Sequence, residues 1–405
     1  MAAENAKRLF LDALAGRPAS RPPVALHWWG TWKYEALGLP FPGAAWRDGA
    51  DLAGVYARFQ EAFRPDWLHL HIGTPRWFRG AEIVERGGGP VLAIAPGMRG
   101  LKSGDRYLSV CSGADEDIVD FPDYLLGSRV CRPKVDLSSE RSVDAYVERW
   151  VRMSAEEIAG LGYTDHVPPV VARFGGEALV AVHIPSAVCE IYDPNTGYTG
   201  FEPGLIAFHD HPDGMRRLLA RCYEAQLEWA RAYARAGAHA FVISESFISP
   251  DIAHPSIYRS YLAGVHRDYF AEIARMGLQP VCMFWGDVMP ILEDLAGIGI
   301  RGLLVEETKK GFTLDIAAIF KILAGRVCLF GNVDSLELLR HGSPESIAAE
   351  VRRQAGGAGA GFVTANGSPV APGTPVENVR ALLAAGRALE GAGPAAADRA
   401  RGGTA

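Results

Sequence analysis

The chain has 405 residues, of which 48% are hydrophobic and 22% charged, the balance of a folded, enzyme-sized protein. Its 41 basic and 47 acidic residues give a net charge of −6, too mild to indicate a nucleic-acid or membrane partner. No apolar run approaches the roughly 18 residues of a membrane span. The N-terminus lacks a signal-peptide core. Six cysteines without a Cys-x-x-Cys pair indicate reduced thiols, so we expect a cytoplasmic protein.

A helix is predicted over residues 5–15, where Pro18, Pro22 and Pro23 follow and end it. Eight short apolar runs come next, and helical segments separate most of them, as in buried parallel strands with crossover helices. The predicted strands are 24–27, 67–71, 179–184, 240–245, 280–284, 302–305, 327–330 and 361–364. The pattern predicts an α/β protein, a (β/α)8 barrel over residues 1–390, followed by a disordered Ala/Gly/Arg-rich tail at 391–405.

Residues 74–135 interrupt the alternation of strands and helices. They contain strand-like pieces between glycine-rich turns such as the run at 87–90. We therefore predict a β-hairpin insertion after the second strand. We expect it to lie over the rim where the carboxyl ends of the strands meet.

Polar side chains stand at the predicted carboxyl ends of the strands, which in a parallel barrel converge on one rim. They are His27, His69, His71, Glu245, Asp287, Glu306, Glu307, Asn332, Asp334 and Asn366. Carboxylates and imidazoles gathered in one place suit a metal site or general acid–base catalysis. The rim is therefore the predicted functional site.

The local sequence favours a functional role for some of these candidates and a structural role for others. His69 and His71 are two residues apart on one strand, so both leave the same face, as metal ligation requires, although plain hydrogen-bonded imidazoles would fit as well. Glu245 ends a buried run, where an unpaired carboxylate is costly, so it should have a partner. Asn332 is also a residue type that holds turns. His183, close to Pro185, is interpreted as a core residue.

Four motifs carry a resemblance to a known family. They are 21–24 before the first strand, Ile248-Ser249-Pro250 after the fourth, Gly331-Asn332-Val333-Asp334 after the seventh, and Pro372-Gly373-Thr374-Pro375-Val376-Glu377-Asn378-Val379 after the eighth. Together they resemble the uroporphyrinogen decarboxylase superfamily, which also contains cobamide-dependent methyltransferases and cobalamin-independent methionine synthase. The resemblance runs over nearly the whole chain and is closer to the methyltransferase-like members. It implies a TIM barrel.

Two departures from the family limit the function. Porphyrinogen decarboxylases carry an Arg-Gln-Ala-Gly-Arg run after the first strand, where this chain has His27-Trp28-Trp29-Gly30-Thr31. Indole and imidazole cannot replace the bidentate guanidinium–carboxylate pair, so we predict no uroporphyrinogen decarboxylation. Thiol-alkylating members hold zinc with a His-x-Cys-Gly run after the fifth strand, where this chain has Met283-Phe284-Trp285-Gly286. The sequence therefore lacks the thiolate zinc motif.

The resemblance to ether-cleaving corrinoid methyltransferases implies a carboxylate–histidine zinc site. Glu245 and His266 are the matching pair, with His69 and His71 as further candidate ligands. The predicted catalytic residues are Glu245, Asp287 and His27. The predicted substrate-binding residues are Trp28, Trp29, Trp285, Asn332 and Asn366, because flat indole walls suit an aromatic or planar substrate.

The leading hypothesis is a methyltransferase that moves a methyl group from a small methoxylated aromatic or methylamine-like donor to a corrinoid protein or another carrier. No corrinoid-binding Asp-x-His-x-x-Gly run is present, so any cobamide arrives on a partner. Two alternatives stay open. One is a metal-free decarboxylase of a small organic acid, with Asp287 or His27 as proton donor. The other is a corrinoid- or pterin-binding accessory protein without turnover. Oligomeric state stays open as well.

Overall fold

The computed structural model describes residues 5–28, 30–39, 49–73, 75–76, 82–86, 89–93, 118–120, 135–192, 201–309 and 311–389. Seven strands form one parallel sheet in the order β1-β5-β6-β7-β8-β9-β10. They are Trp67–Leu70 (β1), Leu179–Pro185 (β5), Ala240–Glu245 (β6), Gln279–Phe284 (β7), Gly302–Val305 (β8), Cys328–Phe330 (β9) and Phe362–Val363 (β10). The predicted α/β fold with a parallel sheet is confirmed, and seven predicted strands are present within one or two residues of their expected ends.

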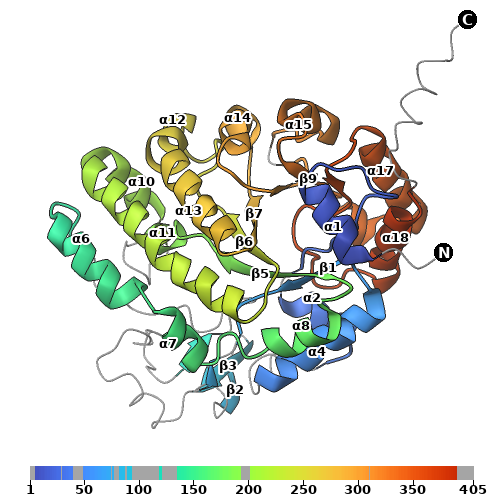
Figure 1. Cartoon of the computed structure of the whole chain (residues 1–405), viewed down its shortest axis with the longest axis horizontal. Helices are drawn as coiled ribbons and strands as arrows, with labels where there is room; N and C mark the ends of the chain where they lie inside the picture. Colours follow the sequence, from blue (N-terminus) through green and yellow to red (C-terminus); the bar gives the residue numbers. More distant parts are fainter. Residues whose placement is uncertain are drawn as a thin grey trace, which may run out of the picture.

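Helices surround the sheet and cover its outer face (Figure 1). In chain order they are Ala6–Leu14 (α1), Gly30–Ala36 (α2), Gly49–Phe63 (α4), Glu140–Tyr146 (α6), Ala155–Gly160 (α7), Val167–Phe174 (α8), Cys189–Tyr192 (α9), Phe201–Asp210 (α10), Pro212–Arg235 (α11), Pro255–Ile257 (α12), Ala263–Arg275 (α13), Leu292–Ala296 (α14), Ile316–Leu323 (α15), Leu338–His341 (α16), Pro344–Gly356 (α17) and Val376–Arg387 (α18). Ahead of α8, the chain forms two short helices, α6 and α7, rather than one continuous helix. Ser154 begins α7 with a capping box, which favours a new helix start.

Alternate residues of each strand face opposite sides of the curled sheet. Trp67 on β1 packs on the inner face, while its neighbour Leu68 packs outward among the helices. Phe10 of α1 closes one end of the inner face by stacking on Trp67, with ring centroids 5.6 Å apart. The amino ends of the strands are therefore filled with apolar side chains, and the inner face becomes polar toward the carboxyl ends.

The predicted first strand, 24–27, is not a regular strand in the structure. Val24 makes a single parallel bridge to Thr364, and the Ala25 amide donates to the Thr364 carbonyl at 2.9 Å. On its other side, the Asp66 amide donates to the Val24 carbonyl at 2.8 Å. The segment therefore lies between β10 and β1 and joins the two edges of the sheet.

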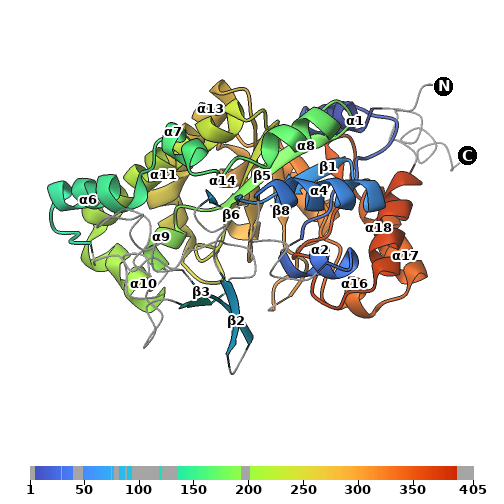
Figure 2. The same cartoon turned by 90° about the horizontal axis from the view of Figure 1, so that it is seen from below.

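Part of the predicted insertion is described, as a three-stranded antiparallel sheet of Glu82–Arg86 (β2), Gly89–Ala93 (β3) and Ile118–Asp120 (β4). Figure 2 shows β2 and β3 on the same side of the molecule as α2, α10 and α16. The rest of the insertion and the tail at 391–405 lie outside the described residues, so the covering of the rim stays a prediction. Among the described helices, none is long and apolar enough to cross a membrane.

Candidate metal centre

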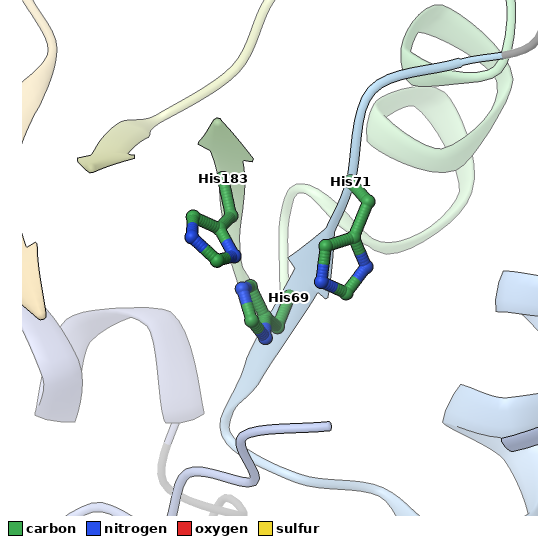
Figure 3. A group of neighbouring side chains, drawn as sticks. All are labelled: His69, His71 and His183. Atoms are coloured by element: carbon green, nitrogen blue, oxygen red, sulfur yellow. The ribbon is translucent and has the colours of Figure 1, made fainter. Parts of the chain in front are cut away.

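Three imidazoles meet on the inner face of the sheet: His69 of β1, His71 just after β1, and His183 of β5 (Figure 3). Each residue offers one ring nitrogen to this group, and the three nitrogens all lie within 4.8 Å of one another. The ring centroids are 4.7 Å apart for His69 and His71, 5.0 Å for His69 and His183, and 5.3 Å for His71 and His183. We call these three residues the histidine triad.

Strand geometry explains why the triad forms. His69 and His71 follow Trp67 at a spacing of two, so all three side chains leave the inner face of β1. In the parallel register His69 lies opposite Ala181, which places His183 two residues further along β5, level with His71. The small Ala181 side chain leaves room between the rings.

Burial keeps the triad uncharged. The three residues are at most 9% exposed. This burial lowers the pKa of His183 to about 3 and the pKa values of His69 and His71 well below their usual range, and repulsion among the imidazolium forms lowers them further. All three rings are therefore neutral at pH 7, the form in which imidazole binds a metal.

The triad also lacks hydrogen-bond partners. Within the described part of the chain, neither nitrogen of His69 or His183 has one, and neither does Nε2 of His71. A buried polar group left unpaired costs about 1–3 kcal/mol, so native proteins rarely keep several together. Three imidazoles with a fourth, open position form the ligand set of a catalytic zinc ion. Tetrahedral zinc with bonds of about 2.1 Å needs nitrogens about 3.4 Å apart, so these nitrogens, now within 4.8 Å of one another, would close by up to about 1.4 Å through small rotations of the rings. The residues therefore fit zinc.

His27 and Trp285 border the triad. The His27 ring lies 5.3 Å from that of His69 and stacks on Trp285 at 5.1 Å. Asn366 fixes the His27 backbone, accepting from its amide at 2.9 Å and donating to its carbonyl at 2.7 Å. The Gly367 carbonyl lies 3.2 Å from His27 Nδ1, so that nitrogen carries the proton. Burial lowers the pKa of His27 to about 3, so at neutral pH it is not an acid that can donate a proton.

Glu245 and His266 form a second buried group. Glu245 Oε1 lies 3.2 Å from His266 Nε2, the Tyr223 hydroxyl donates to Oε1 at 2.5 Å, and the Ser186 hydroxyl donates to Oε2 at 2.7 Å. Glu245 shares the strand face of Phe241 and Ile243, which pack in the outer core. Glu245 thus has the partner that its burial requires. The pair lies between β6 and the helices α11 and α13, whereas His69 and His71 lie on the inner face with His183.

This geometry predicts different effects for two substitutions of Glu245. Glu245→Ala leaves Tyr223, Ser186 and His266 without their common acceptor and should cost about 3–5 kcal/mol of unfolding free energy. Glu245→Gln keeps the shape and one acceptor oxygen, so it should cost much less. Chemical denaturation measures both changes. Zinc content should stay unchanged in both variants, and loss of zinc in Glu245→Gln would instead place this carboxylate in the metal centre.

Other predicted site residues hold the backbone in the structure. Asp287 accepts a hydrogen bond from the Met289 amide at 3.0 Å, and Asn332 donates to two carbonyl groups of neighbouring loops. Trp28 is fully buried and packs with the outer core, although its ring lies 5.7 Å from that of His69, and Trp29 lies outside the described residues. His183 is the triad member that the sequence interpretation had assigned to the core. The spacing of two from Leu179 through Ala181 is the signal that would have found it.

Known proteins give a consistent picture. The chain is 36% identical over 163 residues to methylcobamide:CoM methyltransferase MtaA of Methanosarcina barkeri, covering 40% of this chain and 45% of that protein. It is 28% identical over 224 residues to uroporphyrinogen decarboxylase of Coxiella burnetii, covering 55% of this chain and 58% of that protein. The chain thus spans about half the length of these curated relatives.

A solved structure and a family model complete the comparison. A methyltransferase from Methanosarcina mazei superposes with a TM-score of 0.66 at 21% identity, over 95% of this chain and 99% of that chain, so the two share a fold. The model of the uroporphyrinogen decarboxylase (URO-D) family matches residues 194–389. This match confirms the resemblance carried by the motifs in the second half of the chain. The second half of the chain is therefore similar to the uroporphyrinogen decarboxylase (URO-D) family.

Proposed function

We propose that the protein is a zinc-dependent methyltransferase that demethylates a small aromatic methyl ether and passes the methyl group to a corrinoid carried by a partner protein. The observation that carries this proposal is the triad of neutral, buried imidazoles with unpartnered nitrogens beside an indole ring. The similarity to a methylcobamide:CoM methyltransferase supports the reaction class.

Transfer of the methyl group leaves negative charge on the donor oxygen. The bond between the methyl carbon and oxygen breaks, its electron pair stays on oxygen, and the new bond uses an electron pair of the acceptor. A phenoxide is a poor leaving group unless its charge is neutralised. When bound, zinc supplies Lewis-acid stabilisation worth several kcal/mol at this oxygen. His69, His71 and His183 would hold the metal, and Trp285 would pack against the aromatic ring of the donor.

The chemistry of His27 disfavours the metal-free decarboxylase. Decarboxylation leaves a carbanion that must take up a proton from an acid near the substrate. The pKa of His27, about 3, leaves this ring unprotonated at pH 7. Asp287, the second proton donor considered, holds the Met289 amide. The methyltransferase hypothesis requires no such acid, because the site only needs to stabilise the leaving oxygen.

Turnover with and without metal tests the proposal. We expect purified protein loaded with zinc to convert a methoxylated aromatic compound and free cob(I)alamin to the phenol and methylcobalamin. Chelation should lower the rate at least about a hundredfold, and added zinc should restore it. Product is measured by chromatography and methylcobalamin by absorbance. Turnover that is insensitive to chelation, or release of carbon dioxide without methyl transfer, would contradict the proposal.

A further inference from the structure

Lys33 on α2 is a buried amine with no counter-ion among the described residues, and this burial lowers its pKa to about 7. Its side chain is only 2% exposed, and Nζ lies 4.0 Å from the ring centroid of Tyr56 and 5.0 Å from that of Tyr34. In the described part of the chain, Lys33 has these aromatic contacts and no carboxylate or hydrogen-bond acceptor. Lysine is almost never fully buried unless it is paired, because an isolated ammonium is costly to remove from water.

Contacts connect Lys33 to the histidine triad. Lys33 sits on the ring of Tyr56, and the Tyr56 hydroxyl accepts a hydrogen bond from the His71 amide at 2.9 Å. The positive charge of Lys33 is also one cause of the lowered pKa values of His69 and His71, although burial is the largest cause. Lys33 is therefore connected to the proposed metal centre through one side chain, Tyr56.

The charges near this centre are not balanced. A divalent metal on three neutral imidazoles would add two positive charges, and Lys33 adds a third when it is protonated. Glu306 and Glu307 share a single cation, Lys309, at 3.0 and 3.3 Å, and neither is among the described residues that converge at the triad. Among the described residues, the three ligands that converge are all imidazoles. A ligand that enters this site should therefore bring negative charge with it.

We propose that Lys33 binds a carboxylate group of the substrate, so that the methyl donor is a methoxylated aromatic acid. The inference rests on the proposed function and narrows its donor class. A carboxylate accepts charge-assisted hydrogen bonds from an ammonium and supplies the counter-ion that the structure around Lys33 lacks. While no ligand is bound, the faces of Tyr56 and Tyr34 stabilise the ammonium by cation–π interaction.

Two probes that differ only in the carboxylate test the proposal: methoxybenzoate and methoxybenzene. Isothermal titration calorimetry should show that the zinc-loaded wild-type protein binds methoxybenzoate at least about tenfold more tightly. Lys33→Met, which keeps the length of the side chain and removes its charge, should abolish this preference and leave methoxybenzene binding unchanged. Lys33→Arg should keep part of the preference, which guards against misfolding of the methionine variant. Lys7→Met removes a half-buried lysine that donates to the Gly175 carbonyl, and it should keep the full preference.

Titrations of chelated protein distinguish the contribution of Lys33 from that of zinc. A preference for the carboxylate that persists without zinc must come from the protein. If Lys33→Met binds the two probes with the wild-type preference, or only lowers the melting temperature, the lysine is structural and the proposal is overturned. If Lys33 proves necessary for methoxybenzoate binding but no methyl group leaves, the proposed methyl transfer fails while the assignment of Lys33 stands.

Discussion

Replacement of His183 by alanine is expected to remove stoichiometric zinc and to lower methyl transfer at least about a hundredfold, because two imidazoles alone hold zinc weakly. Bound zinc is measured by mass spectrometry after gel filtration, and turnover is measured with the same preparation. The fold should survive, since His183 makes no hydrogen bond within the described residues. Alanine should also relieve the cost of burying two unpartnered nitrogens.

His266→Ala is the matched control. Both imidazoles are buried, at 5% exposure for His183 and 0% for His266, but His266 contacts Glu245 and two tyrosine hydroxyls on the outer side of the sheet. This variant should keep its zinc and lose stability. The opposite result, with zinc lost in His266→Ala and kept in His183→Ala, would favour the metal site of Glu245 and His266 that the family resemblance implies.

Acid should unfold the metal-free protein at a pH where most enzymes are stable. Burial lowers the pKa values of His27 and His183 to about 3 and that of His166 to about 4, whereas an unfolded histidine titrates near 6.5. The contribution that these neutral imidazoles make to the free energy of unfolding is fully present above pH 6.5. As the pH falls from 6.5 toward 4, the unfolded chain binds up to three more protons than the folded one, and each costs about 1.4 kcal/mol per pH unit.

At pH 5.5 these three residues together remove roughly 4 kcal/mol, a large part of the 5–15 kcal/mol that holds a typical domain. His69 and His71, whose pKa values are also lowered, add to this loss. Circular dichroism of chelator-treated protein between pH 8 and 4 measures the transition, and zinc-loaded protein should unfold at a lower pH. A folding free energy that stays constant from pH 7 to 5 would show that the buried imidazoles are protonated in the folded state.

The sequence predicted most of the strands because parallel strands are continuous apolar runs with sharp ends. The segment at 24–27 was predicted as a regular strand because its residues are apolar. In the structure it makes isolated bridges between the two edges of the sheet instead. Apolar periodicity reports burial, and both a strand and a bridging segment are buried. Only the hydrogen bonds to Thr364 and Asp66 distinguish them, and the residues that make them lie far apart in the chain.

The site was predicted in part. His69 and His71 were recognised from their spacing, whereas His183 was assigned to the core because its neighbours on β5 are apolar on both faces. Every residue of β6 is buried as well, so the sequence does not show which face of the sheet carries Glu245. Lys33 was missed because a lysine inside a helix usually reaches solvent. The placement of His183, Glu245 and Lys33 depends on which face of the strand or helix points inward. Only the folded structure shows this.

The histidine triad spans residues 69–183, whereas the family match begins at residue 194. The proposed metal chemistry therefore belongs to the half of the chain that the family model does not cover.

The junction of β10 and β1, which residues 24–27 bridge, has a consequence for how the protein folds during synthesis. Asn366 fixes the backbone of His27 across 339 residues of sequence, so the wall of the site next to His69 is set only after nearly the whole chain has left the ribosome. Contacts of such separation form late and slowly in folding. Until these contacts form, the edges of β1 and β10 lack the segment that joins them. The wall beside His69 should therefore be completed in a late step of folding, after the rest of the sheet has formed.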